Sequence, residues 1–290
     1  MKKSRKLATL GICSALFLGL AACQQQHATS EGTNQRQSSS AKVLWKASYT
    51  NLNNQVSTEE VKSLLSAHLD PNSVDAFFNL VNDYNTIVGS TGLSGDFTSF
   101  THTEYDVEKI SHLWNQKKGD FVGTNCRINS YCLLKNSVTI PKLEKNDQLL
   151  FLDNDAIDKG KVFDSQDKEE FDILFSRVPT EATIDVKVHA EKMETFFSQF
   201  QFNEKARMLS VVLHDNLDGE YLFVGHVGVL VPADDGFLFV EKLTFEEPYQ
   251  AIKFASKEDC YKYLGTKYAD YTGEGLAKPF IMDNDKWVKL

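Results

Sequence analysis

Cys126 is the residue whose type and position are best suited to nucleophilic chemistry. It ends the segment GDFVGTNC and opens a run with apolar residues at helical spacing. Thr124 or Asn125 can cap this helix, which would place Cys126 in its first turn. Unpaired backbone N–H groups and the helix dipole stabilise a thiolate at that position and lower its pKa. Cys132 lies six residues further on and lacks this benefit, so we expect it to be a buried structural thiol.

His226 is the matching candidate base, in the middle of an expected strand over 220–231. A histidine on an apolar strand face is costly unless it has a partner, and the nearby Gly225 and Gly228 let another group approach closely. A tight turn near 234 would place either Glu241 or Lys242 opposite the imidazole. The predicted triad is Cys126 as nucleophile, His226 as base and Glu241 as the residue that orients the base. The face predicted for this strand carries Leu222, Val224, His226, Gly228 and Leu230.

Other residues near these two are candidates for substrate binding. Arg127 either binds a substrate carboxylate or faces solvent, and we favour solvent. Tyr249 and Gln250 either line the same cleft or cap a following helix. Possible donors to an oxyanion are Asn125, Asn115 and Gln116. The substrate-binding candidates are therefore Asn125, Arg127, Tyr249 and Gln250.

Both members of the pair also have purely structural interpretations. Free cysteine is among the most buried residue types, so Cys126 could be an inert core thiol. His226 could equally be a core histidine whose hydrogen bonds are satisfied. The aspartates of the segment DNDAID miss the spacing of a calcium loop, and we interpret them as turn formers. We expect neither a metal site nor a cofactor.

The elements that would position these residues belong to two classes. Short β-branched and aromatic runs separated by Asp/Asn/Gly turns predict an antiparallel meander over 208–214, 220–231 and 237–244. A helical stretch is expected from Pro248 to about Tyr268. The order of helices, then sheet, then helix predicts an α+β fold in one domain over 42–290. Helical spacing also predicts helices over about 58–69, 73–89, 104–117, 167–177 and 189–200.

Cys126 at a helix start, followed by a strand reading His-Val-Gly-Val, is similar to the NlpC-type cysteine peptidases and amidases of bacterial cell walls. The resemblance spans about 115–268. It implies a papain-like core, a polar third residue on the neighbouring strand, a peptidoglycan peptide as substrate, and an insertion over 140–205. The segments GDFVGTNCRIN, GHVGVL, FVEKLTFEEPYQ and PFIMDNDKW also resemble an uncharacterised family of Gram-positive surface lipoproteins.

The N-terminus has the three parts of a secretory signal: basic MKKSRK, an apolar run to Leu20, and the small residues before Cys23. Leu-Ala-Ala-Cys resembles the bacterial lipobox, which implies cleavage after residue 22 and diacylglycerol on Cys23. Residues 23–41 are rich in Gln, Ser and Thr, and we expect a flexible tether there. These features predict a lipid-anchored protein on the outer face of the cell membrane.

Composition and charge exclude several classes of protein. The chain has 290 residues, 42% hydrophobic and 24% charged, which excludes a disordered chain and a multi-span membrane protein. Its net charge is -9; removing the four bases of the signal from 31 leaves 27 against 40 acids, or -13. Such an acidic chain repels phosphate, so we expect no nucleic-acid partner. The three thiols left after processing are Cys126, Cys132 and Cys260, an odd number that leaves at least one free within the chain.

Two functions follow as hypotheses. The first is a lipid-anchored Cys-His amidase or peptidase that acts on cell-wall peptide. The alternative is a non-catalytic surface module that keeps a papain-like fold, uses the helical part over 57–118 as its binding face and takes another surface protein as its partner. A transporter's solute-binding lipoprotein fits less well, because it would require parallel strands in two lobes.

Overall fold

The structure is a computed structural model that describes residues 46–100 and 103–290. The expected signal, the lipidated Cys23 and the tether lie outside these residues. The described residues lie in one compact unit and form a mixed α+β fold. Its helices are α1 (Gln55–Ser66), α2 (Pro71–Val88), α3 (Val107–Lys118), α4 (Cys126–Leu134), α5 (Phe151–Gly160), α6 (Ser165–Leu174), α7 (Val186–Phe197) and α8 (Lys257–Lys267), with 3-10 turns η1 (Gly89–Thr91) and η2 (Gln148–Leu150).

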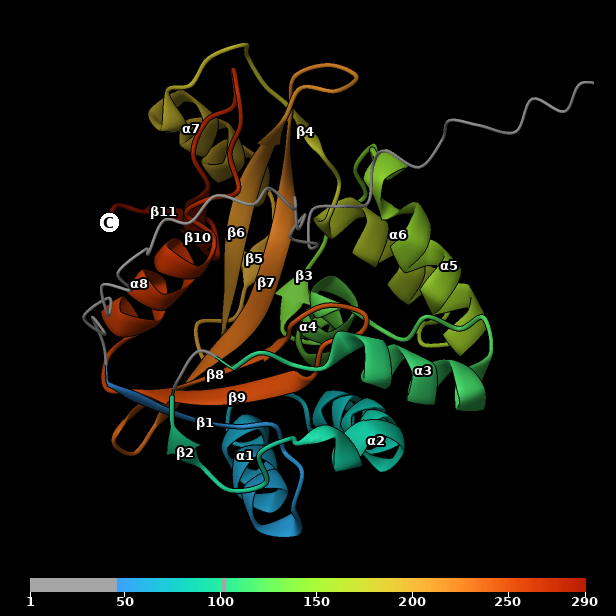
Figure 1. Ribbon diagram of the computed structural model, residues 1–290. Coiled ribbons are helices and arrows are strands. Elements are labelled where there is room, and N and C mark those ends of the chain that lie inside the picture. Colours follow the sequence, from blue (N-terminus) through green and yellow to red (C-terminus); the bar gives the residue numbers. More distant parts are fainter. Residues whose placement is uncertain (1–45, 101–102) are drawn as a thin grey trace, which may run out of the picture. The chain divides into compact units, whose positions relative to one another are not determined.

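The strands form a large antiparallel sheet in the order β11-β10-β6-β7-β8-β9-β1-β2, and β4 pairs with one end of β7. A separate two-stranded sheet joins β3 and β5. The predicted meander is confirmed as β6, β7 and β8, at the centre of the sheet (Figure 1). The strands are β1 (Ala47–Thr50), β2 (Thr98–Ser99), β3 (Val138–Thr139), β4 (Val178–Pro179), β5 (Gln201–Phe202), β6 (Arg207–Asp215), β7 (Tyr221–Ala233), β8 (Gly236–Lys242), β9 (Tyr249–Phe254), β10 (Phe280–Asp283) and β11 (Lys286–Val288).

The segment after Pro248 corrects the sequence prediction. Residues 249–254 are not helical; they form β9, which lies between β8 and β1, and the helix begins only after its N-cap Ser256. A strand buried on both faces lacks polar alternation, so a short apolar run does not distinguish it from a buried helix. The sheet also contains β1, which precedes all the helices in the chain, and β10 and β11, which follow the last helix. Its strands are therefore not confined to the part of the chain between α7 and α8, where the sequence analysis expected them.

The segment DNDAID is a second correction. It forms most of α5 and does not form turns, and Asp153 in its first turn is fully buried. Together with α6, α7 and the short strands β4 and β5, α5 occupies the region over 140–205 in which an insertion was expected.

The sheet separates two apolar clusters. The larger cluster holds core residues of α1 to α7 against one face, and the smaller holds α8 against the other. Figure 1 shows α8 (red) and α4 (green) on opposite sides of β6 and β7. Residues of β7 alternate between these clusters: Val227, Val229 and Val231 belong to the larger one and Leu230 to the smaller.

A bulge in β7 interrupts this alternation. Val211 of β6 pairs with His226, whereas the next residue, Val212, pairs with Val224, so Gly225 is the extra residue. Leu222 and Val224 therefore share the cluster of Val227 and not the face of His226. The single face predicted for Leu222 through Leu230 is wrong for this reason.

Candidate functional site

Cys126 is the first residue of α4. Asn125 is the N-cap, and its Oδ1 accepts a hydrogen bond from the Ile128 N–H at 3.1 Å, which confirms one of the two expected caps. Cys126 is 5% exposed. The helix thus presents its positive end to a buried thiol.

The edge of β7 explains how His226 reaches this thiol. The pairing of β7 with β8 runs from Val229 to Ala233, and before Val229 the strand turns to α4. There the Arg127 guanidinium donates to the carbonyl of Val224 at 3.0 Å, and the Ser130 hydroxyl donates to that of Val227 at 3.2 Å. The N-terminus of α4 therefore lies along the open edge of β7, and the thiol of Cys126 lies close enough to the His226 imidazole for each to shift the pKa of the other.

Glu241 is the partner on the other side of the imidazole. Its Oε2 lies 2.5 Å from His226 Nε2, so the nitrogen left for Cys126 is Nδ1. Of the two residues that the sequence left open, the structure pairs Glu241 with His226; Lys242 points away and donates to three carbonyl groups of the next loop. Cys126, His226 and Glu241 are thus brought together in the predicted order.

Three side chains at the C-terminal part of α8 hold this pair, and sequence reasoning missed them. The Tyr263 hydroxyl donates to Glu241 Oε1 at 2.5 Å, and the Lys267 ammonium lies 3.4 Å from the same oxygen. The Tyr268 ring stacks on His226 with centroids 4.9 Å apart. The i,i+4 spacing of Tyr263 and Lys267 was the available signal, because it places both on one helix face.

The charges of these groups favour an ion pair. Burial opposes the thiolate of Cys126, but the charge and hydrogen bond of His226, with the charge of Arg127, lower the pKa of the thiol. Burial also opposes the imidazolium of His226, yet Cys126 and Glu241 raise its pKa. Against its own burial, Lys267, His226 and Tyr263 lower the pKa of Glu241 to about 2. The arrangement can thus hold a thiolate beside an imidazolium.

Arg127 does not face solvent, and the interpretation we favoured is wrong. Its Nε and Nη2 donate to the two oxygens of Asp153 at 2.9 and 2.7 Å. The Asn125 amide also donates to Asp153, at 2.7 Å. Asp153 therefore anchors the residues on both sides of Cys126, and the sequence analysis had assigned it to a turn.

The other predicted binding residues are Tyr249 and Gln250. They lie behind the loop over 119–125 that leads into Cys126, which we call the cysteine loop. The Tyr249 hydroxyl donates to Asn129 Oδ1 at 3.0 Å and lies 3.3 Å from the hydroxyl of Thr124. The Gln250 amide donates to the Tyr105 hydroxyl at 2.7 Å. Both side chains are buried on β9, so neither caps a helix.

The remaining candidate donors lie on α3. Gln116 bonds with His112, its neighbour one turn away. Asn115 lines a surface hollow that does not include Cys126 among its lining residues. The Asn125 amide is already engaged by Asp153.

The other two thiols are structural, as expected for Cys132. Cys126, Cys132 and Cys260 are all free and buried. Burial raises the pKa of Cys132 to about 12, and burial with the nearby Glu241 raises that of Cys260. Over residues 46–100 and 103–290, no three His, Cys, Asp or Glu side chains gather as a metal ion would require. Within the same part of the chain, no helix has both the length and the apolarity to cross a bilayer.

Comparison with known proteins places most of the chain in one family. No curated protein and no solved structure matches it. A family model described as a domain of unknown function, DUF4300, matches residues 48–288, which include every side chain of the site described above. The chain therefore belongs to the DUF4300 family.

Proposed function

We propose that this protein is a cysteine peptidase or amidase that cleaves an amide bond through a thioester on Cys126. The Cys126 thiolate attacks the carbonyl carbon, and the leaving amine takes the proton held by His226. His226 then accepts a proton from water, which attacks the thioester and releases the acid. Glu241 keeps the imidazole in place and stabilises its charge through both steps.

One observation carries this proposal: the two nitrogens of His226 face a carboxylate and a thiol at the start of a helix. A buried core histidine needs two hydrogen-bond partners, but it does not need a thiol whose pKa is lowered. The oxyanion donor we assign is the N–H of Cys126, which as a first-turn amide has no partner within the helix. Asn125 is not assigned this role, because its amide is engaged by Asp153.

The substrate class and location are part of the same proposal. The order of a Cys-bearing helix, a His strand and a carboxylate on the neighbouring strand supports a papain-like core of the NlpC type. Peptidoglycan peptide is the substrate class that this relationship implies. A lipid on Cys23 and a tether over 23–41 would keep the domain at the outer face of the membrane, within reach of the cell wall.

A second candidate function rests on the burial of the site. Cys126 is 5% and His226 2% exposed, which is the condition expected of a binding or scaffold module that has kept the fold. In that case the helices α1 to α3 would form the surface that binds another protein.

The deciding experiment is the pH dependence of Cys126 alkylation by iodoacetamide, measured by peptide mass spectrometry on residues 42–290. We expect rapid labelling below pH 7, and a loss on the order of 100-fold in His226→Ala, because an unassisted thiol titrates near pH 8.5. Hydrolysis of purified cell-wall peptides, absent in Cys126→Ser, would then identify the bond. Slow labelling that is unchanged in His226→Ala would reject the enzyme and favour the binding module.

A further inference from the structure

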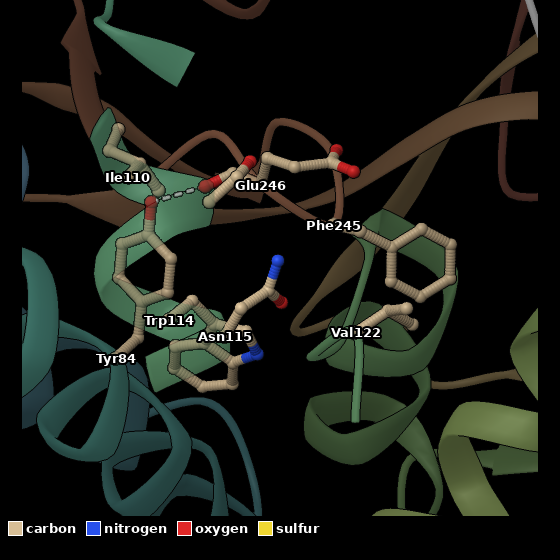
Figure 2. A pocket seen from close by; sticks show the side chains of 8 residues that line it. Tyr84, Ile110, Trp114, Asn115, Val122, Phe245 and Glu246 are labelled. Carbon is tan, nitrogen blue, oxygen red and sulfur yellow. Dashed lines mark hydrogen bonds between the residues drawn. The ribbon is translucent and has the colours of Figure 1, made fainter. Parts of the chain in front are cut away.

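A hollow of about 430 Å³, counting the part open to solvent, lies beside the segment that leads into Cys126. One wall is α3, and the opposite wall is the loop over 243–248 between β8 and β9. Figure 2 shows the rings of Tyr84, Trp114 and Phe245 around it. Its lining residues are Tyr84, Ile110, Ser111, Trp114, Asn115, Val122, Phe245 and Glu246.

The loop wall is held by a buried lysine. Lys242 is 1% exposed, and its ammonium donates to the carbonyl oxygens of Thr244 at 2.7 Å, Phe245 at 3.1 Å and Glu247. All three of its N–H groups are thereby used on one loop. A buried ammonium is costly, and burial lowers the pKa of Lys242 to about 7. Despite this cost, the three hydrogen bonds of Lys242 hold the backbone of the loop over 243–248 in one conformation.

Two further hydrogen bonds fix the backbone around the hollow. The Tyr84 hydroxyl donates to the carbonyl of Glu246 at 2.5 Å, as the dashed line in Figure 2 shows. The Trp114 indole donates to the carbonyl of Phe121 at 2.6 Å. Gly123 has a φ of 93°, and a Cβ there would lie 3.4 Å from both the carbonyl oxygen of Phe245 and the Trp114 ring. The cysteine loop, α3 and the loop over 243–248 are therefore closely packed.

Two exposed polar side chains from opposite walls, Glu246 and Asn115, are open to a ligand in the hollow. The Glu246 carboxylate accepts one long hydrogen bond, 3.3 Å from the Thr244 hydroxyl, and its charge acts on the nearby Lys242 ammonium without a direct ion pair among the described residues. The Asn115 side chain is also exposed, and Figure 2 shows its amide pointing into the hollow. A carboxylate, an amide oxygen and aromatic faces are the groups that bind a primary ammonium group.

We propose that this hollow binds a primary ammonium group carried by the substrate of the Cys126 site, a role that rests on the proposed function. The Glu246 carboxylate and the Asn115 carbonyl accept its N–H groups, and the Trp114 and Tyr84 rings contact its alkyl stem. Val122 lines the hollow four residues before Cys126, so the two sites are at most about 14 Å apart along the backbone. That span suits an amine and a scissile carbonyl separated by one or two residues of a peptide.

Binding of two isosteric probes to residues 42–290 tests this assignment. Nα-acetyl-lysine methylamide carries the ammonium group, and Nα-acetyl-norleucine methylamide lacks it. The readout is the indole N–H resonance of Trp114 in a titration followed by NMR. We expect the lysine probe to shift this resonance and to bind at least tenfold more tightly than the norleucine probe.

Glu246→Gln and Glu247→Gln are matched variants, because both remove one charge from the same loop and only Glu246 lines the hollow. We expect Glu246→Gln to weaken the lysine probe about tenfold and Glu247→Gln to change its affinity less than twofold. Equal affinity for the two probes, or equal effects of the two variants, would overturn the assignment.

The binding readout requires no turnover, so the two proposals can fail separately. Glu246-dependent binding together with an unreactive Cys126 would reject the peptidase and retain the ammonium site. A reactive Cys126 together with equal binding of the two probes would retain the peptidase and reject the ammonium site.

Discussion

Two buried histidines on neighbouring strands each lie beside a glutamate, yet their surroundings differ. His226 on β7 lies 2.5 Å from Glu241, and His214 on β6 lies 2.7 Å from Glu220. The other nitrogen of His214 accepts a hydrogen bond from the N–H of Ala277 at 3.1 Å. The other nitrogen of His226 faces the thiol of Cys126.

This difference teaches that a His-Glu pair does not by itself make a reactive site. At His214 the backbone N–H of Ala277 donates to Nδ1 and the carboxylate of Glu220 lies beside Nε2, so structural groups engage both nitrogens of that ring. His189 packs against it with ring centroids 4.4 Å apart, and its own nitrogens bond with Thr180 and Thr183. At His226 the second partner is the Cys126 thiol, which can itself lose a proton. Of these two histidines, only His226 can therefore exchange a proton with its second partner.

The largest expected effect compares the two thiols of α4. Cys126 should be alkylated on the order of 1,000-fold faster than Cys132 at pH 7, because burial raises the pKa of Cys132 to about 12 while His226 lowers that of Cys126. Peptide mass spectrometry of the native protein measures both rates in one sample. Equal alkylation rates of Cys126 and Cys132 would show that the thiol at the start of α4 is no more reactive than the thiol further along the helix.

The next effect concerns the support of the cysteine loop. Asp153→Asn should lower the free energy of unfolding by about 3 kcal/mol, because it leaves the largely buried Arg127 guanidinium without its counter-charge. Urea unfolding followed by circular dichroism measures this loss. Glu191→Gln, which removes the partner of exposed Lys187, is the control and should cost less than about 0.5 kcal/mol.

A matched pair of glutamates tests the comparison directly. Glu241→Gln should slow Cys126 alkylation at pH 6 about tenfold, since one unit of pKa corresponds to tenfold in thiolate population and the imidazolium loses its buried counter-charge. Glu220→Gln should change the rate less than twofold, because His214 does not contact Cys126. If the two variants behave alike, the carboxylate at His226 has no special role.

The smallest effect is a pH dependence at the second histidine site. Burial lowers the pKa of His189 in the folded protein, so its contribution to stability is present above the unfolded pKa near 6.5 and is lost as pH falls below it. His226 has the opposite sign, because its raised pKa gives stability that is lost as pH rises.

His189→Gln should therefore reduce the loss of stability between pH 7 and pH 5 by about 1 kcal/mol, and chemical denaturation at a series of pH values measures it. The exposed His112→Gln serves as the control and should leave the pH profile unchanged. An unchanged profile in His189→Gln would show that this buried histidine carries no titration penalty.

Several errors of sequence reasoning have a common physical origin. The sequence of β9 predicts a helix because its residues are buried on both faces and show no polar alternation. That burial is decided by the pairing with β1, about 200 residues earlier in the chain. Asp153 reads as a turn former because its partner Arg127 lies 26 positions away. Gly228 suggests room for a catalytic group, but a Cβ there would collide with the ring of Phe239.

The local features of this protein were determined by its sequence alone. The cap formed by Asn125, the place of Cys126 in the first turn of α4 and the hairpins of the meander depend on contacts within a few residues. Such contacts form whatever the rest of the chain does, so periodicity and capping rules find them.

The tertiary structure decided which residues meet. The bulge at Gly225 turns His226 to the face of Glu241, and adjacent residues of β8 point to opposite faces, so only the strand register selects Glu241 over Lys242. The open edge of β7 before Val229 admits the N-terminus of α4. These choices depend on packing between segments about 100 residues apart, and no local pattern in the sequence records them.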